Sequence, residues 1–209
     1  MNKINSCLVI CLVLGLSAVN GFAESTGVKE TAIFASGCFW CTEKDFESVK
    51  GVDSAVSGYI GGTQENPTYK QVSKGITGHT EAVLVTYNPE LVSYEQLLKV
   101  YWYSVDPFVK DRQFCDSGSQ YRSAIFYADE KQKQAALESL KNLKSAHGIT
   151  KKIFTEIVPA DKFWTAESYH QDYYKHNPVR YNFYRFNCGR DQRLEEIWGD
   201  HAGWKPNKK

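Results

Sequence analysis

The sequence predicts an α+β fold, a two-layer sandwich in which helices cover one face of a mixed sheet. Two observations lead to this fold class. Short apolar runs that are typical of buried strands alternate with longer segments of helical spacing between residues 31 and 158. After Asn177-Pro178 the periodicity is lost until Leu194, which predicts a long irregular carboxyl-terminal segment.

The first predicted strand and helix meet at a cysteine. Residues 31–35 form a short apolar run that ends before Gly37. From Phe39 onward the apolar positions have helical spacing, and Gly51 stops that helix. Cys38 is therefore expected at or near the first residue of a helix.

The alternation continues along the chain. A capping box of Ser93 and Gln96 marks the start of one helix, and Asp129 caps a long polar helix that runs to about Ala146. The glycine-rich stretch 58–78 predicts a long irregular loop, and such loops are usually functional. Further strands are predicted at residues 81–87, 123–128 and 152–158.

The amino terminus is typical of a signal peptide. Lys3 is the only charge before the apolar run 7–19, and residues 21–23 provide a cleavage site. The run is too short to span a bilayer, and an amino-terminal core helix is the alternative interpretation. Residues 1–23 are predicted to be removed. Residues 24–209 are then predicted to form a single domain that is periplasmic or secreted and does not insert into a membrane.

The composition favours redox chemistry over binding of polyanions. Lys plus Arg is 25 and Asp plus Glu is 24, so nothing favours nucleic acid or an anionic membrane as a partner. The 13 Tyr, 11 Phe and 5 Trp would line a pocket as readily as fill a core. Outside the signal peptide the cysteines are too few for a disulfide-stapled scaffold. They are Cys38, Cys41, Cys115 and Cys188.

Cys38 is the candidate nucleophile. A thiol at a helix amino terminus faces the positive end of the dipole and unpaired N–H groups, which favour the thiolate. Half of a zinc site and an inert buried cysteine are the alternatives, although no second closely spaced pair accompanies Cys38 and Cys41. Phe39 and Trp40 point in different directions, so at least one is expected to flank the thiol in a small apolar cup.

Glu81 and two tyrosines are weaker candidates. Glu81 lies in the segment GHTEAVLV, where a solvated glutamate at a strand end is the ordinary interpretation. Burial near Cys38 would instead raise its pKa and keep it protonated, as a general acid requires. Tyr69 and Tyr121 follow polar loop residues, but tyrosine is too abundant here for either to be informative alone. The pattern leaves these roles open.

Seven segments after the signal peptide carry a family resemblance. They are Gly37-Cys38-Phe39-Trp40, GYIGG, NPTY, TGHTEAV, DPFVKDRQFCDSGSQYRSAIF, AESYHQDYY and NCGRDQRLEEIWG. Through these segments the chain resembles the A family of peptide methionine sulfoxide reductases over nearly its whole length after the signal peptide. This resemblance implies a ferredoxin-like sandwich, a single catalytic domain over residues 24–209, and the S epimer of methionine sulfoxide, free or in proteins, as substrate.

The resemblance also implies a role for each site residue. Cys38 is the nucleophile, and Phe39 and Trp40 form an apolar pocket for the substrate methyl group. Glu81 is the acid that protonates the sulfoxide oxygen. The phenols that hydrogen-bond this oxygen are Tyr69 and Tyr121, and further substrate-binding residues are Asp116, His170, Tyr173 and Tyr181.

The implied reaction leaves a sulfenic acid on Cys38, which a second thiol converts to a disulfide that a thioredoxin-like dithiol reduces. No metal or organic cofactor is required. Many family members have glycine at the position of Cys41 and resolve the sulfenic acid from the carboxyl-terminal tail. Cys41, Cys115 and Cys188 therefore compete for this role. Cys41 is preferred because it lies one helical turn from Cys38, and Cys188 is the alternative.

Two other functions fit parts of the pattern. A thiol-disulfide oxidoreductase would act through Cys38 and Cys41 without Glu81, but the few prolines do not single out the cis-proline loop expected of thioredoxin-like domains. An aromatic-rich binding module would hold all four cysteines in two structural disulfides. The favoured function predicts a monomer that repairs oxidised exported proteins and receives electrons from an exported partner or a membrane relay.

Overall fold

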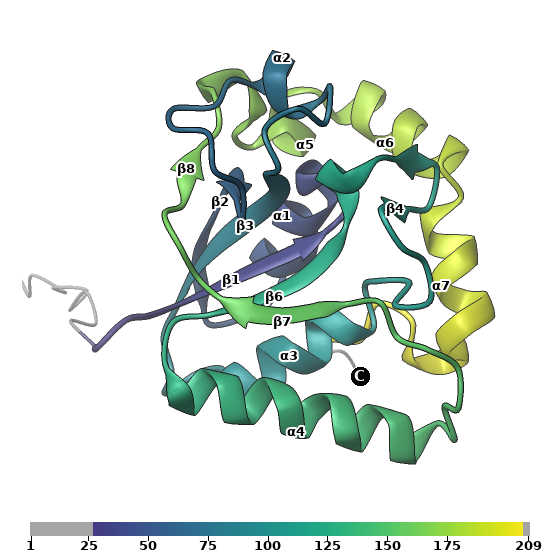
Figure 1. Ribbon diagram of the computed structural model, residues 1–209. Coiled ribbons are helices and arrows are strands. Elements are labelled where there is room, and N and C mark those ends of the chain that lie inside the picture. The colour runs from purple at the N-terminus through teal and green to yellow at the C-terminus, as the bar shows by residue number, and fades with distance from the viewer. Residues whose placement is uncertain (1–26, 207–209) are drawn as a thin grey trace, which may run out of the picture.

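The computed structural model describes residues 27–206, and the predicted signal peptide lies outside them (Figure 1). Six strands form a mixed sheet in the order β7-β6-β1-β3-β2-β8, in which only the β6 and β7 pair is parallel. The α+β prediction is confirmed, whereas the ferredoxin-like arrangement stays a prediction. The strands are β1 (Glu30–Ser36), β2 (Val52–Ile60), β3 (Thr80–Tyr87), β6 (Ser123–Tyr127), β7 (Glu156–Pro159) and β8 (Trp164–Thr165), with a separate hairpin of β4 (Arg112–Gln113) and β5 (Asp116–Ser117).

The helices connect these strands and follow them at the carboxyl end. In Figure 1, α2, α5 and α6 gather at the upper end of the sheet, and α3 and α4 lie side by side at the lower end. Within the described chain, no helix is long and apolar enough to cross a membrane. The helices are α1 (Phe39–Glu47), α2 (Tyr69–Val72), α3 (Tyr94–Trp102), α4 (Glu130–Ala146), α5 (Tyr173–His176), α6 (Pro178–Asn187) and α7 (Arg190–Trp198), with short 3₁₀ turns η1 (Ser119–Tyr121), η2 (Ser168–His170) and η3 (Gly199–His201).

One face of the sheet carries the main core. Successive strand residues point to opposite faces, so Phe34 of β1 and its cross-strand partner Val83 of β3 lie on the same side. They pack with side chains from α1, α3, α4 and α7 in one buried cluster. Ala35 and Ala82 belong to a smaller cluster on the opposite face, covered by a loop that includes Phe163. The prediction of helices on one face is confirmed.

The predicted helix caps are confirmed. Ser93 and Gln96 form a reciprocal capping box at the start of α3, with Gln96 N 3.3 Å from Ser93 Oγ. Asp129 accepts a hydrogen bond from the backbone N–H of Gln132 at 2.8 Å, and α4 ends at Ala146. The strand predicted at 152–158 is wrong in its first half, because β7 begins only at Glu156.

The loop predicted over residues 58–78 is wrong at its start. Gly58 lies inside the long strand β2, paired with Ala82 of β3. A Cβ atom at Gly58 would lie 2.3 Å from the Phe163 ring and 2.4 Å from the Trp164 carbonyl oxygen. Glycine is required there because another segment approaches closely, which sequence reasoning interpreted as a loop signal.

The irregular carboxyl-terminal segment is also a wrong prediction, because α6 and α7 are helical. Pro178 occupies the first turn of α6, where a missing N–H costs no hydrogen bond. Phe183 and Phe186 of α6 are exposed to solvent, so the apolar residues do not mark a buried face. These two features hide the helical period in the sequence.

Candidate active site

The chain enters the site through a turn that only glycine can form. Gly37 has φ of +87°, and a Cβ atom there would lie 2.5 Å from Cβ of Gln113. The next residue, Cys38, immediately precedes α1, as predicted. Its carbonyl oxygen accepts hydrogen bonds from the backbone N–H groups of Cys41 at 3.1 Å and Thr42 at 3.3 Å. The first turn of α1 therefore carries both thiols.

A cavity of about 70 Å³ lies beside Cys38. It is built from segments that are far apart in the sequence: the start of α1, the short helix α2, strands β3 and β5, the η1 turn and helix α6. Seven of the predicted site residues line it, together with one tyrosine that was not predicted. The lining residues are Cys38, Phe39, Trp40, Tyr69, Glu81, Asp116, Tyr121 and Tyr184.

Glu81 is a buried acid rather than the solvated strand-end residue of the ordinary interpretation, since only 2% of its surface is exposed. Its Oε2 accepts a hydrogen bond from the backbone N–H of Phe39 at 3.0 Å. Burial raises the pKa of Glu81 to about 8, and the negative charge of Asp116 acts in the same direction. The hydrogen bond from Phe39 opposes this shift without cancelling it. Glu81 is therefore protonated at neutral pH.

Cys38 and Cys41 are both buried and free. Burial raises the pKa of Cys38 well above its ordinary range, and a hydrogen bond with Cys41 raises it further. The same hydrogen bond lowers the pKa of Cys41 to about 7, and the charges of Arg190 and Arg185 also lower it. Burial therefore opposes the effect of the helix dipole at Cys38, and the thiolate expected there stays a prediction.

Two phenols complete the polar side of the cavity. Burial raises the pKa values of Tyr69 and Tyr121 above their usual range, so both stay neutral hydrogen-bond donors. The backbone N–H of Tyr69 donates to Glu167 at 2.8 Å. Glu167 also accepts from the hydroxyl of Tyr59, a strand residue paired with Glu81. Glu167 therefore ties α2 to the sheet beside the acid.

The aromatic side of the cavity is supported from behind. Trp40 stacks on Tyr173, with ring centroids 3.7 Å apart and planes at 8°. The indole N–H of Trp40 donates to Nδ1 of His170 at 3.1 Å. Burial lowers the pKa of His170, which keeps this nitrogen available as an acceptor. His170 and Tyr173 thus orient Trp40 and do not themselves line the cavity.

Two tyrosines of α6 occupy different places. Tyr181, predicted to bind substrate, is buried outside the cavity lining, where its hydroxyl accepts a hydrogen bond from Arg185 at 3.1 Å. Tyr184 lines the cavity instead and donates a hydrogen bond to Oδ2 of Asp116. Sequence reasoning missed Tyr184 because it placed no helix over 178–187. Helical spacing would have put Tyr184 and Cys188 on one side.

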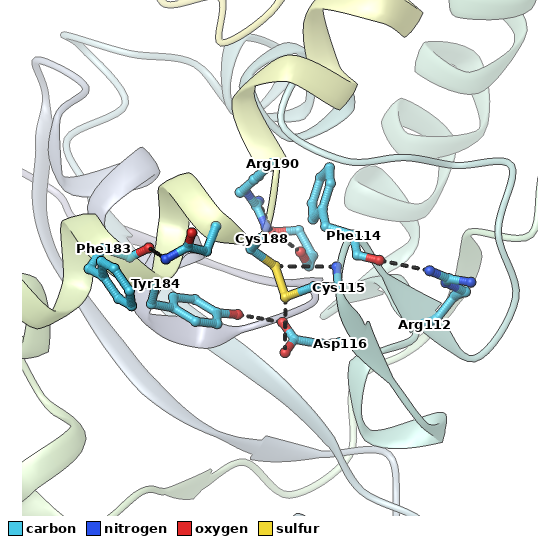
Figure 2. Close-up of a disulfide and its surroundings, with 10 residues drawn as sticks. Arg112, Phe114, Cys115, Asp116, Phe183, Tyr184, Cys188 and Arg190 are labelled. Atoms are coloured by element: carbon cyan, nitrogen blue, oxygen red, sulfur yellow. Dashed lines mark hydrogen bonds between the residues drawn. A yellow bond between two sulfur atoms is a disulfide. The ribbon is translucent and has the colours of Figure 1, made fainter.

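The other two cysteines within residues 27–206 are bonded to each other. Cys115 and Cys188 form a disulfide beside Asp116, as Figure 2 shows. Two of the three candidates for the resolving thiol are therefore paired in this structure, and Cys41 is free. The binding module with two disulfides is a wrong prediction, since Cys38 and Cys41 are not linked.

Two groups of residues within the described chain have metal-ligand spacing, and neither includes Cys38 or Cys41. The first group contains Cys115 and Cys188, whose sulfurs are joined in the disulfide. In the second, Lys175 Nζ lies 2.6 Å from carboxylate oxygens of both Glu47 and Asp172, so an ammonium group already balances their charge. Among the described residues, the zinc interpretation of Cys38 and Cys41 therefore finds no further ligand.

Comparison with known families identifies this arrangement. The family model described as peptide methionine sulfoxide reductase matches residues 30–202. The chain belongs to the peptide methionine sulfoxide reductase family. Peptide methionine sulfoxide reductase MsrA of Bacillus velezensis is 46% identical over 172 residues, which cover 82% of this chain and 97% of that protein. The MsrA/MsrB protein of Vibrio cholerae is 49% identical over 184 residues, and the match spans 88% of this chain but 49% of that relative.

Solved structures of MsrA proteins share the fold. Methionine sulfoxide reductase A of Corynebacterium diphtheriae superimposes with a TM-score of 0.68 at 36% identity, covering 78% of this chain and 81% of that one. Reduced Mxr1 of Saccharomyces cerevisiae gives a TM-score of 0.68 at 30% identity, covering 72% and 87%. The resemblance drawn from the sequence motifs is confirmed, and membership of the MsrA family replaces the thiol-disulfide oxidoreductase interpretation.

Proposed function

We propose that this MsrA-family chain is a peptide-methionine (S)-S-oxide reductase that converts the S epimer of methionine sulfoxide, free or in proteins, to methionine. The observation that carries the proposal is the meeting of a thiol and a protonated carboxylic acid in one cavity, Cys38 and Glu81. The names of the MsrA relatives support the same activity.

The cavity suits a methyl sulfoxide group. Phe39 and Trp40 offer an apolar surface to the methyl group, and the acid and phenols of Glu81, Tyr69 and Tyr121 offer donors to the oxygen. A sulfoxide oxygen is a poor leaving group until it is protonated. Buried neutral donors that point at developing charge lower that barrier more than donors in water would. The polar and apolar sides of the cavity therefore match the two ends of the reacting group.

The reaction follows from these positions. The Cys38 sulfur bonds to the substrate sulfur as Glu81 gives its proton to the oxygen, and the sulfur–oxygen bond breaks so that the oxygen leaves as hydroxide. This hydroxide, or a water molecule exchanged for it, then bonds to the Cys38 sulfur and breaks the bond between the two sulfurs. Methionine leaves, and Cys38 is oxidised to a sulfenic acid while the substrate sulfur is reduced by two electrons. Cys41 is hydrogen-bonded to Cys38 in the resting site, and the proton that Cys38 loses as it attacks passes to water. Burial of the Cys38 thiol keeps it unreactive until substrate fills the cavity.

Cys41 is the proposed resolving thiol. It lies in the same helical turn as Cys38, where Cβ atoms are about 5 to 6 Å apart, and a small shift of that turn brings the sulfurs together. Attack of Cys41 on the sulfenic sulfur forms a Cys38–Cys41 disulfide and releases water. The alternative resolver, Cys188, would first have to break its bond to Cys115.

The proposal extends to the setting of the enzyme. The predicted signal peptide supports export to the periplasm or beyond, where a monomer would repair oxidised exported proteins. A thioredoxin-like dithiol in the same compartment then reduces the Cys38–Cys41 disulfide and is itself oxidised.

An assay on the separated epimers tests the activity. The purified chain is incubated with dithiothreitol and either the S or the R epimer of methionine sulfoxide, and methionine is quantified. Methionine should form from the S epimer, with the R epimer at the rate of the enzyme-free control. Equal turnover of both epimers would contradict the assignment. Reduction of protein disulfides without turnover of either epimer would assign a thiol-disulfide oxidoreductase.

Peptide mapping tests the resolving thiol. A chain in which Cys38 and Cys41 are reduced and the Cys115–Cys188 link is intact receives one equivalent of the S epimer and is then alkylated and digested. Cys38 should be found linked to Cys41. The physical reason is that these two thiols are free and adjacent, whereas Cys115 and Cys188 are paired. A dominant link between Cys38 and Cys188, or full recycling of a Cys41→Ser variant by a thioredoxin-like protein, would reassign the role.

A further inference from the structure

The Cys115–Cys188 disulfide lies next to the cavity but takes no part in the reaction described above. It joins the turn of the β4–β5 hairpin to the residue that follows α6, across a sequence separation of 73. The backbone N–H of Cys115 donates to Sγ of Cys188 at 3.2 Å, so the two segments also meet through the backbone (Figure 2). The proposed turnover requires only Cys38 and Cys41, which leaves this bond without a chemical role.

Each half of the disulfide stands beside a residue that lines the cavity. Asp116 directly follows Cys115, and Sγ of Cys115 lies 3.8 Å from its Oδ1. Tyr184 precedes Cys188 by one helical turn, and its carbonyl oxygen accepts the backbone N–H of Cys188 at 2.9 Å. The two lining side chains are hydrogen-bonded to each other. We call this pair, Asp116 and Tyr184, the cavity wall.

The hairpin side of the wall has little support of its own. Strands β4 and β5 have two residues each, and isolated hairpins of that size are not stable. On β4, Gln113 is buried and bonded twice to the backbone of Asp106. On β5, Asp116 is only partly buried and Ser117 is exposed. The strand that carries Asp116 is therefore the less anchored half.

Apart from the disulfide, few noncovalent contacts join the β4–β5 hairpin to the carboxyl-terminal helices. The guanidinium of Arg190 lies 4.4 Å from the centroid of the Phe114 ring, and Tyr184 bonds to Asp116. A single hydrogen bond of this kind contributes little net stability, and somewhat more when one partner is charged. The Cys115–Cys188 disulfide lies one residue from Asp116. It therefore keeps the Tyr184 hydroxyl and the Asp116 carboxylate at a high effective concentration.

We propose that the Cys115–Cys188 disulfide is a positioning bond that holds the wall of Asp116 and Tyr184 against the substrate cavity. The inference rests on the proposed reductase activity. With the bond present, substrate meets a formed cavity. Without it, each binding event must also order the β5 strand against α6, so the affinity for substrate falls. Cys38 and Glu81 are held by α1 and β3, which the disulfide does not touch, so the chemical step keeps its rate.

First-turnover kinetics separate these effects. Wild-type chain, with its Cys115–Cys188 link verified by mass spectrometry, and a Cys115→Ser/Cys188→Ser variant are mixed with the S epimer in the absence of external thiol. The concentration for half-maximal rate should rise about tenfold in the variant, while the maximal rate changes by less than about twofold. Thermal melts check that both proteins are folded at the assay temperature. If the serine variant melts below it, Cys115→Val/Cys188→Ala, which keeps apolar contact, replaces it.

A double-mutant cycle connects the bond to the wall. Tyr184→Phe removes the hydroxyl that bonds Asp116. It should weaken substrate binding in the disulfide-bonded chain and have little further effect in the variant that lacks both cysteines, because the wall is already open there. Independent, additive effects would mean that the disulfide does not act through the wall.

Several results would overturn the inference. An unchanged half-saturating concentration would show that the bond does not position the site, and a wild-type chain without the Cys115–Cys188 link would remove its basis. A variant with a normal first turnover that cannot be recycled by dithiol would make the pair an electron carrier instead. Failure of the wild-type chain to reduce either epimer would instead contradict the proposed function. That outcome is measured in the separate assay on the two epimers.

Discussion

Replacement of Cys38 by serine is expected to abolish reduction of the S epimer, leaving the rate of the enzyme-free control. A serine hydroxyl cannot replace a thiolate near neutral pH, and it cannot form the sulfenic acid on which the rest of the cycle depends. The measurement is methionine release in the first turnover and at steady state with dithiothreitol.

Cys41→Ser is the matched control for this loss. It removes the neighbouring thiol of the same helical turn but keeps the nucleophile, so its first turnover should proceed although resolution fails. Turnover of Cys38→Ser comparable to the parent would move the nucleophile to another cysteine and contradict the assignment of the site.

Glu81→Gln is expected to lower kcat by about a hundredfold or more and to change KM little. The amide keeps a hydrogen-bond donor in the cavity but has no proton to transfer to the sulfoxide oxygen. Glu43→Gln is a matched control. Glu43 lies on α1 and is also buried, and its pKa is raised to about 7. Glu43 is bonded to Ser57 and lies outside the cavity lining. A Glu81→Gln variant as fast as the parent would make this acid a bystander.

The pH dependence of the parent should report the same group. Burial raises the pKa of Glu81 from 4.5 to about 8, and the protonated form is the active one. The kcat/KM of the parent should therefore fall as pH rises through about 8, and Glu81→Gln should lack that limb. The contribution of Glu81 to the free energy of unfolding also falls as pH rises. Neutral Glu81 contributes fully to the free energy of unfolding below about pH 4.5, and this contribution is lost as pH rises through about 8.

Local sequence signals predicted the elements that position the nucleophile. The apolar run before Gly37 and the helical spacing after Phe39 placed Cys38 at the start of α1, because strand and helix periods and glycine turns are set by neighbouring residues. The capping residues Ser93 and Asp129 predicted two more helix starts for the same reason. Signals of this kind need no knowledge of what packs against the segment.

The remaining features of the site depend on contacts between distant segments. Glu81 is buried because β3 lies between β1 and β2 and under α1. The strand sequence alone does not reveal these neighbours, and it therefore suggested a solvated residue. Four cysteines allow three connectivities, and the pairing of Cys115 with Cys188 follows only from the folded hairpin and α6. The raised pKa of Cys38 likewise reflects tertiary burial, which opposes the local helix dipole.

The most direct test of the central claim is to trap the product of the Cys38 attack. A Cys41→Ser chain is mixed with one equivalent of the S epimer in the presence of dimedone, which reacts with sulfenic acids, and both methionine and labelled peptides are quantified. Methionine should form in an amount equimolar with the enzyme, with the dimedone adduct on Cys38. Methionine without an adduct on Cys38, or an adduct on another cysteine, would contradict the assignment of Cys38 as the nucleophile.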